Sequence, residues 1–454
     1  MSLDRIIYRL TDERIPAVTG IGLVGDILER ADFYNMFRNS ETPKRSKKQI
    51  NTASILATYI SLLCMGKPDF ECVREFQNDA KFYQSALHLR SGFPSPETLR
   101  QRMDNIGNSL RQLILDFNTN LLKTNKIKPT PLENGLIPID IDVTPMDNSN
   151  TKKEGVSWTY KHYNGYAPIM AYIGKEGYLV NTELREGKQH CQNGTPAFLK
   201  ETITQSRKIT DRPLLVRLDS GNDAAENVGI MLENGVFYII KRNLRSEGRT
   251  EWADNIKSWC KDIRHPRDGK TVYVGTTYKT ISYITESGEK KEIVNRIVYE
   301  MTERTSKADG QMYLIPEIDI NMFWTNLGDS DQTIIDLYHS HAECEQFHSE
   351  IKSDMDVERL PSGKFSTNEL VLELTLIAYN ILRMLGQETI NQGNAPAKRP
   401  IKRRRVRTVI QNIIHFAGHF TTHARRLYLS VSQSNAWSRA FMGLTKRLHC
   451  KHIG

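Results

Sequence analysis

The chain has 454 residues, of which 39% are hydrophobic and 25% are charged. These values are ordinary for a globular protein of two or three domains. No basic-then-apolar signal opens the sequence, and the longest apolar stretch, 370–385, is interrupted by Glu373, Asn380 and Arg383. We therefore expect neither secretion nor a membrane-spanning helix. The six cysteines are scattered without a Cys-x-x-Cys pair, which argues against a zinc finger or a disulfide framework and favours the reducing cytoplasm.

Positive charge is concentrated near the C-terminus. The net charge is +9, and residues 391–454 hold 13 Lys and Arg without any Asp or Glu, so the first 390 residues carry −4. Such asymmetry indicates a polyanionic partner, and DNA or RNA is the simplest. We expect 391–454 to form a basic, helical C-terminal region that contacts DNA through Arg403, Arg404 and Arg405.

The first 130 residues have the pattern of a helical domain. Residues 51–63 place apolar side chains at helical spacing, and Ser95 followed by Pro96 is typical of a helix start, with Ser95 as the N-cap. Short helices with basic first turns suit a helix-turn-helix-like DNA reader. Its candidate contacts are Arg100, Arg102 and the basic cluster 44–48, and solvated surface charge is the alternative interpretation.

From Leu136 onward the pattern changes to strands separated by helices, which predicts a mixed α/β sheet. The expected strands are 136–143, 166–173, 178–184, 214–219 and 236–241, with helices near 196–208 and 223–234. Alternating segments between 242 and 325 favour antiparallel strands, and helices return after Asp331. We therefore divide this part of the chain into two pieces of an α/β core, 131–241 and 326–390, and a β-rich insertion, 242–325.

Two aspartates close apolar runs. Asp142 ends the run that begins at Gly135, and Asp219 ends the run that begins at Pro213. Carboxylates at the ends of central strands make a plausible magnesium cradle, since carboxylate oxygens and waters are what this ion prefers. Asp140 shares a strand face with Asp142 and is the nearest rival for the first position. Either aspartate alone would more often be a turn or capping residue.

A third element follows at 338–352. Five polar side chains fall at the spacing i, i+3, i+7, i+10 and i+14, which is one stripe on a helix and is polar where a core-facing stripe would be apolar. They are Tyr338, His341, Glu345, His348 and Lys352. A solvated helix face is the alternative, but an aromatic ring, two imidazoles, a carboxylate and an ammonium in one row favour a functional site.

These motifs resemble those of DDE-type bacterial insertion-sequence transposases with a ribonuclease-H-like fold. Many members share Tyr-x2-Arg-x3-Glu-x6-Lys around the third catalytic acid, and this chain has Tyr338-x2-His341-x3-Glu345-x6-Lys352. Asp142-Val-Thr144 looks like the first-aspartate strand of the family, and Arg217-Leu-Asp219-Ser-Gly221 is similar to the Arg-x-Asp-Ser-Gly of one branch. That branch also carries a β-rich insertion before the glutamate. His341 departs from the usual Arg.

The resemblance implies a fold, a chemistry and a set of partners. It implies a ribonuclease-H-like mixed sheet in which Asp142, Asp219 and Glu345 hold two Mg²⁺ or Mn²⁺ ions. These ions would support cleavage at transposon ends and strand transfer into target DNA. Tyr338 and Lys352 would hold DNA phosphates, with His341 as a weaker helper. The implied partners are DNA with terminal inverted repeats, target DNA and a second copy of the chain in a synaptic complex, at the nucleoid of a bacterial cell.

Two other classes stay open. One is a nuclease of the same fold that cuts without joining, such as a domesticated transposase, which a strand-transfer assay with a pre-cleaved end would separate. The other is a non-catalytic DNA-binding regulator, against which the presence of all three acids counts. A zinc enzyme is less favoured, since the 12 histidines form no His-x3-His or His-Glu-x-x-His pair on a plausible scaffold.

Overall fold

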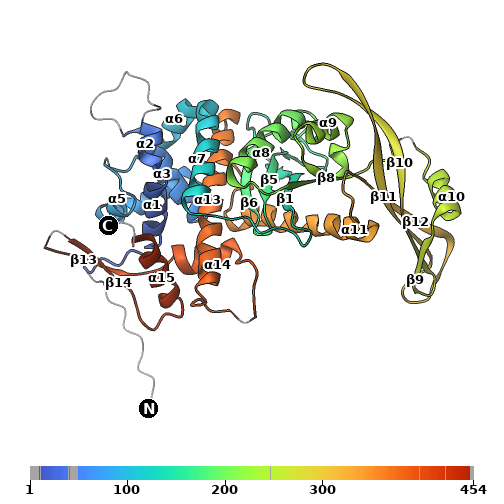
Figure 1. Cartoon of the computed structure of the whole chain (residues 1–454). Helices are drawn as coiled ribbons and strands as arrows, with labels where there is room; N and C mark the ends of the chain where they lie inside the picture. The colour runs from blue at the N-terminus through green and yellow to red at the C-terminus, as the bar shows by residue number, and fades with distance from the viewer. Residues whose placement is uncertain are drawn as a thin grey trace, which may run out of the picture. The chain divides into compact units, whose positions relative to one another are not determined.

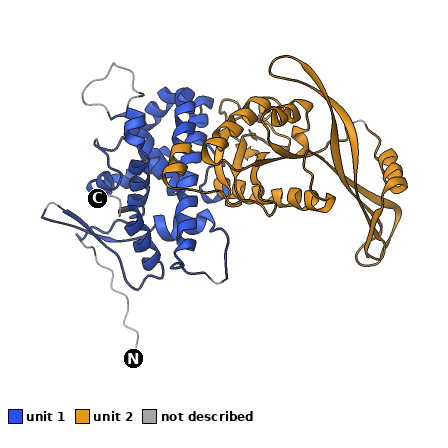
Figure 2. Cartoon of the chain, viewed as in Figure 1, with its two compact units in different colours: residues 1–117, 353–454 blue, residues 118–352 orange. Residues whose placement is uncertain are grey.

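The computed structural model describes residues 10, 12–38, 40, 50–90, 92–245, 247–397, 399–424 and 426–449. The chain forms two compact units (Figure 2). Residues 1–117 and 353–454 make up the helical unit, and residues 118–352 make up the sheet unit. The two ends of the chain thus share one unit, and the expected core segment 326–390 is divided after Lys352. The basic cluster predicted at 44–48 lies outside the described residues.

The helical unit is built on two buried helices (Figure 1). Every residue of α3 (Thr52–Cys64) is buried, and residues 370–385 of α13 (Phe365–Asn391) are buried throughout. The two helices pack against each other, as expected of helices that are buried on all sides. The other helices of this unit are α1 (Ile21–Arg30), α2 (Phe33–Arg38), α4 (Arg74–Asn78), α5 (Ala80–Ala86), α6 (Pro96–Ile106), α14 (Val406–Val409) and α15 (Ser438–His449), and the chain passes into the sheet unit within α7 (Arg111–Thr124). No helix in the described ranges is long and apolar enough to cross a bilayer.

The predicted start of α6 is confirmed. The Ser95 hydroxyl accepts a hydrogen bond from the Thr98 backbone N–H at 3.2 Å, and Pro96 is the first helical residue. The two arginines of this helix already have partners in the helical unit. Arg100 forms ion pairs with Glu97 and Asp104 on the same helix, whereas Arg102 donates to the Ile50 carbonyl at 2.7 Å. Arg102 therefore anchors the start of α3.

The C-terminal region is not all helical as predicted. It contains a hairpin of β13 (His419–His423) and β14 (Arg426–Ser430), in which Thr421 pairs with Tyr428. The predicted helical region thus also contains a hairpin, because β-branched and aromatic residues gather here and favour strands. The region also belongs to the core of the helical unit, since Phe416 stacks on Phe441 with ring centroids 4.6 Å apart.

The sheet unit contains one sheet of nine strands in the order β6-β5-β1-β7-β8-β12-β11-β10-β9. The first five are β1 (Ile137–Val143), β5 (Ile169–Ile173), β6 (Tyr178–Glu183), β7 (Leu214–Leu218) and β8 (Phe237–Lys241). β1 runs parallel to β7 and antiparallel to β5, and β7 runs parallel to β8. This order and these directions are those of a ribonuclease-H-like sheet, as predicted. Helices α8 (Thr195–Ile209) and α9 (Ala225–Glu233) connect the later strands.

The β-rich insertion extends the same sheet. After α10 (Arg249–Trp259) it forms β9 (Asp262–Arg267), β10 (Lys270–Ile284), β11 (Lys290–Ser306) and β12 (Met312–Thr325), and β12 pairs with β8. Figure 1 shows the long strands β10 to β12 as a curved ribbon reaching beyond the helices of the core. Its base is anchored by apolar residues of β7, β8, β12 and α11 (Asp331–His339), including Leu215, Ile239, Phe323 and Ile334.

A polar cluster fixes the entry to the insertion. Glu247 accepts hydrogen bonds from Arg242, from Lys279 at 2.7 Å and from the Trp252 indole at 2.9 Å. Burial alone would raise the pKa of Glu247, but these donors outweigh it and lower the pKa to about 2. The Arg242 guanidinium also lies over the Trp252 and Trp324 rings. The cluster therefore ties α10 to β10 and β12.

Candidate active site

Asp142 and Asp219 lie side by side at the end of the sheet. β1 and β7 are parallel neighbours in which Asp140 is opposite Arg217, so two residues farther along Asp142 comes opposite Asp219. Asp142 is the last residue but one of β1, and Asp219 comes directly after the fully buried strand β7. The sequence patterns at the two strand ends therefore predicted a real juxtaposition, since the carboxyl ends of parallel strands meet at one edge.

The pKa values of the two carboxylates are shifted in opposite directions. Burial raises the pKa of Asp219, and the negative charge of Asp142 raises it further. Burial also disfavours the charged form of Asp142, but hydrogen bonding and charge from His348 outweigh it, so the pKa of Asp142 is lowered. Two neighbouring acids whose environments push their pKa values apart are typical of functional sites. A bound cation would relieve the repulsion that Asp219 experiences.

The turn after β7 shapes the space around Asp219. The Asn222 side-chain amide donates to Asp219 Oδ1 at 2.7 Å, which fixes the carboxylate. The Cys191 thiol donates to the Gly221 carbonyl at 2.8 Å. A Cβ at position 221 would lie 2.6 Å from Cys191 Sγ and 3.3 Å from Asp219 Oδ2. Gly221 is therefore required by close packing against both neighbours.

Asp140 belongs to a buried ion network and is not open to a metal. Its two oxygens accept hydrogen bonds from Arg217 Nε at 2.6 Å and from Arg217 Nη2 at 2.7 Å. His341 Nδ1 lies 2.8 Å from the same carboxylate. Arg217 also donates to the Leu337 carbonyl and to Ser340, at the end of α11. This network connects β1 and β7 to the segment that carries the third acid.

The stripe at 338–352 does not lie on one continuous helix. After α11, residues 340–343 form a 3-10 turn, α12 spans Cys344–Ser349, and residues 350–354 form a π-helix. Tyr338 is partly buried against Phe323, and the pKa of its hydroxyl is raised by burial and by the charges of Asp219 and Asp142. His341 is 8% exposed, and its Nδ1 faces Asp140 rather than a phosphate outside the protein.

The remaining members of the stripe have different surroundings. Glu345 is exposed at the start of α12. Lys352 donates to the Pro145 carbonyl at 2.7 Å, in the loop that follows Asp142. His341 and Lys352 are thus both joined to the β1 end of the site. In the described part of the chain, no set of three His, Cys, Asp or Glu side chains is grouped closely enough to hold a metal ion.

Sequence reasoning gave no role to two residues beside Asp142. His348 Nε2 lies 3.4 Å from Asp142 Oδ2, and its Nδ1 lies 3.1 Å from the Tyr172 hydroxyl. Its place on the polar stripe was the signal available in the sequence. Tyr160 donates to the Val143 carbonyl at 3.1 Å, and the charges of Asp142 and Asp219 help burial to raise its pKa. No local pattern marked Tyr160, which comes from the loop between the short strands β3 (Ser157–Trp158) and β4 (Asn164–Tyr166).

The three C-terminal arginines have unequal surroundings in the helical unit. Arg404 is only 5% exposed and lies over the Trp437 ring at 4.9 Å, and burial lowers the pKa of its guanidinium. Arg405 forms a two-pronged ion pair with Asp354 at 2.7 and 2.9 Å. Arg403 is partly buried. Arg404 therefore packs in the interior, which corrects its expected place on a DNA-binding surface.

Paired carboxylates on a ribonuclease-H-like sheet agree with the DDE class of nucleic-acid-processing proteins that the sequence motifs resemble. A family profile described as "Transposase DDE domain group 1" matches residues 4–452. The chain belongs to this DDE transposase family. A search of curated proteins found no match. Among solved structures, the chain is similar to the piggyBac transposase in a synaptic complex with hairpin DNA, at 9% identity and a TM-score of 0.41, over 96% of this chain and 81% of that one.

Proposed function

We propose that this transposase cuts DNA at transposon ends and joins them to target DNA at the site formed by Asp142, Asp219 and Glu345. The observation that carries the proposal is the closeness of Asp142 and Asp219 at the ends of two parallel central strands, where the charge of Asp142 raises the pKa of Asp219. Their charges repel each other in a partly buried setting, and carboxylate oxygens are the donors that Mg²⁺ and Mn²⁺ prefer. The donor set therefore suits divalent metal, and two ions are the number that the resemblance implies.

In this proposal Asp142 and Asp219 supply the fixed part of the metal site. His348 keeps Asp142 ionised, and Asn222 holds Asp219 in place. Glu345, exposed at the start of α12, is the third ligand and joins when DNA is bound. With metal present, the site would activate a water or a 3′-hydroxyl and stabilise the leaving oxygen. Hydrolysis and strand transfer then differ only in the nucleophile.

Nearby cationic and aromatic groups would position the DNA strand. We propose that Tyr338 and Lys352 contact phosphates flanking the reacting one, as the resemblance implies. Two observations support this: the charges of Asp219 and Asp142 act on the Tyr338 hydroxyl, and Lys352 donates to the Pro145 carbonyl in the loop after Asp142. His341 takes a different role from the one its sequence position suggested. Through Asp140 it holds the segment bearing Glu345 against β1, as a positioning residue.

The test is metal-dependent cleavage of a duplex carrying the transposon end. Asp142→Asn, Asp219→Asn and Glu345→Gln should each reduce cleavage by at least about 10³-fold with end binding retained, since each removes a metal ligand. Glu343→Gln is the matched control, because Glu343 is exposed two residues before Glu345 and has no place in the site. Wild-type cleavage by Glu345→Gln would exclude Glu345 as the third ligand.

Cut-and-paste transposition also requires joining. When a pre-cleaved end is incubated with a supercoiled target, the wild-type chain should insert it. Because joining uses the same active site as cleavage, Asp142→Asn should not join the end. The resemblance further implies terminal inverted repeats and a dimer that brings two ends together at the bacterial nucleoid. Cleavage without insertion would favour the nuclease of the same fold instead.

A further inference from the structure

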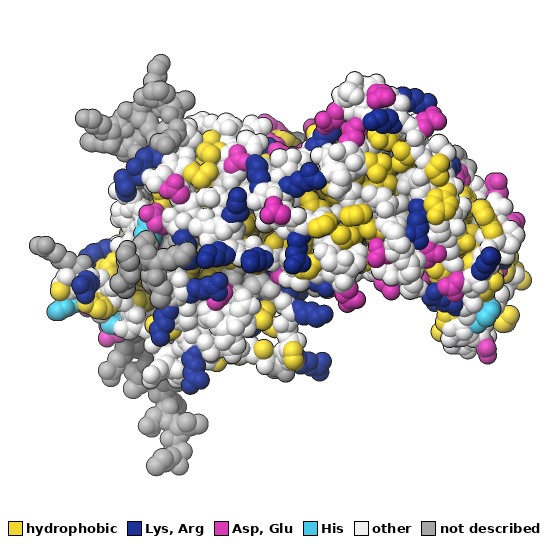
Figure 3. Space-filling model, viewed as in Figure 1, with side chains coloured by type: hydrophobic (Ala, Val, Ile, Leu, Met, Phe, Trp, Pro, Cys, Tyr) yellow, Lys and Arg dark blue, Asp and Glu magenta, His cyan; other side chains and the backbone are white. Residues whose placement is uncertain are grey.

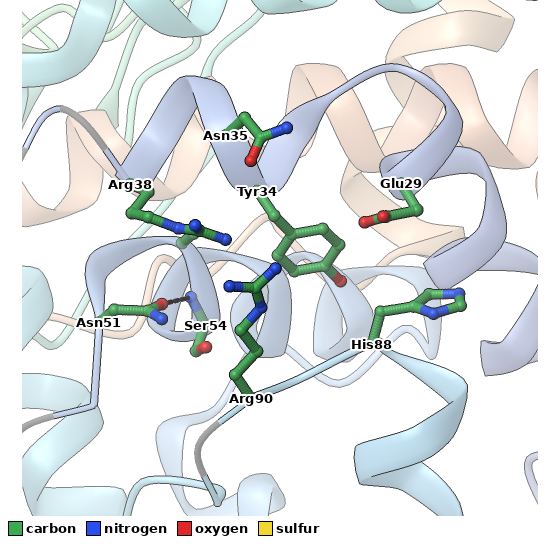
Figure 4. Close-up of a pocket in the computed structure, with 9 residues that line it drawn as sticks. Glu29, Tyr34, Asn35, Arg38, Asn51, Ser54, His88 and Arg90 are labelled. Atoms are coloured by element: carbon green, nitrogen blue, oxygen red, sulfur yellow. Dashed lines mark hydrogen bonds between the residues drawn. The ribbon is translucent and has the colours of Figure 1, made fainter.

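A polar pocket of about 330 Å³ opens in the helical unit, and its lining residues are remote in sequence from Asp142, Asp219 and Glu345. It is formed where the end of α2, the start of α3 and the chain after α5 meet (Figure 4). Two arginines, Arg38 and Arg90, contribute to its lining. The other lining residues are Glu29, Tyr34, Asn35, Asn51, Ala53, Ser54 and His88. Apart from Ala53, every lining side chain has a polar atom, which is unlike a pocket for an apolar ligand.

The two guanidinium groups point toward one another across the pocket (Figure 4). No ion pair to either one is found within the described part of the chain. The imidazole of the pocket differs in this respect, since His88 Nε2 lies 3.0 Å from Asp26 Oδ1. Two like charges that converge without a counter-charge repel each other, and an anion placed between them would remove that repulsion.

The single acid of the lining does not supply the missing counter-charge. The charge of Glu29 acts on the Tyr34 hydroxyl and on the His88 imidazole, whose pKa values it helps to raise. In Figure 4 its carboxylate lies on the far side of the Tyr34 ring from Arg38. The first turn of α3 is also already capped, because Asn51 Oδ1 accepts from the Ser54 N–H at 2.7 Å. Anion attraction at this pocket therefore comes from the two guanidiniums.

The charge of the whole unit favours a polyanion as the source of that anion. The helical unit has 32 Lys and Arg against 20 Asp and Glu, a net charge of +12, whereas the sheet unit has 30 against 33. On the face shown in Figure 3, Lys and Arg side chains are spread over the helical unit with few acids among them. A cationic surface of this kind attracts DNA and brings its phosphates to any fitting pocket.

We propose that the pocket between Arg38 and Arg90 binds a backbone phosphate of duplex DNA and fixes the helical unit in register on the transposon end. Guanidinium groups bind phosphate oxygens in a two-pronged manner, so two of them can hold one phosphate from two sides. Asn35 also lines the pocket, and its side-chain amide donates to Asp32 Oδ1 at 2.6 Å with one N–H left over. Such a contact positions the protein without reading base sequence. The choice of DNA as the ligand rests on the proposed transposase function.

The experiment measures duplex binding by the full chain across a salt series from about 50 to 200 mM. The variant Arg38→Gln/Arg90→Gln should bind a transposon-end duplex at least about 10-fold more weakly at the lowest salt. Its slope of log K against log salt should fall by about 0.9 for the one phosphate released. Arg74→Gln is the matched control, since Arg74 is an exposed arginine of the same unit paired with Glu71. Arg38→Lys/Arg90→Lys, which keeps both charges, should lose less affinity than the Gln pair but more than the control.

Three results would overturn the proposal. Equal losses in Arg74→Gln and in the Gln pair would show general charge attraction only. A wild-type slope in the Gln pair would show that no phosphate is held there. If inorganic phosphate raises the unfolding temperature of the wild type but not of the Gln pair, while both bind DNA equally, the pocket serves free phosphate. Cleavage by the wild-type chain, assayed at saturating DNA, reports separately on the acidic site and shows whether the proposed function itself has failed.

Discussion

Replacing Arg217 by Met should destabilise the sheet unit more than any exposed substitution. The Arg217 side chain is 3% exposed and its partner Asp140 is 5% exposed. Without the guanidinium, Asp140 would keep a buried negative charge with only His341 beside it. Removing one member of a buried pair costs roughly 3–5 kcal/mol, because the remaining charge stays desolvated. The Leu337 carbonyl and Ser340 would also lose their donor.

Urea unfolding followed by tryptophan fluorescence measures this cost. The double variant Asp140→Leu/Arg217→Met should be more stable than Arg217→Met alone, because it removes the orphaned charge along with its partner. Arg304→Met is the control, since Arg304 forms a partly exposed pair with Glu317 and should cost at most about 1 kcal/mol. A cost below about 1 kcal/mol for Arg217→Met, or strict additivity in the double variant, would refute the buried network as the link between β1, β7 and α11.

Three further outcomes follow from particular contacts. Phe441→Ala, which removes the ring stacked on Phe416, should lower the unfolding free energy of the helical unit by roughly 3–5 kcal/mol, and an unchanged urea midpoint would contradict the packing. The pKa of Glu247 is about 2 in the folded protein, so its contribution to stability is present above the usual carboxyl pKa near 4.5 and is lost as the pH falls from there toward 2. Glu247→Gln should therefore lose less stability than the wild type between these pH values. An identical dependence of stability on pH in the two proteins would count against the cluster around Glu247. Gly221→Ala should impair cleavage, because the added Cβ would press against Cys191. Adding Cys191→Ala to this variant should restore part of the cleavage activity. Full activity in Gly221→Ala alone would disprove the tight packing of the turn.

Local patterns predicted the elements and the two aspartates, because alternation and strand ends are set by residues near in sequence. The strands predicted at 136–143 and 214–219 occur at Ile137–Val143 and Leu214–Leu218, and their parallel pairing places Asp142 beside Asp219. The β-rich nature of the insertion was likewise readable from alternation.

Contacts between distant segments could not be predicted. The sequence alone leaves Asp140 as a possible metal ligand. Its carboxylate is instead bound by Arg217 and His341, which lie 77 and 201 residues away along the chain. The burial of Arg404 depends on Trp437, and its basic sequence context indicated the opposite. His341 is polar in the sequence but buried in the fold, where its Nδ1 lies 2.8 Å from the Asp140 carboxylate of β1.

Binding of Mn²⁺ to the full chain, followed by electron paramagnetic resonance of the free ion, tests the central claim most directly. The account predicts that the wild type and Glu343→Gln bind Mn²⁺ alike. Asp142→Asn and Asp219→Asn should each weaken binding at least about 10-fold, because each removes a carboxylate ligand from a site that has few others. Binding by Asp142→Asn and Asp219→Asn as tight as that of the wild type would contradict the assignment of the metal site to the ends of β1 and β7.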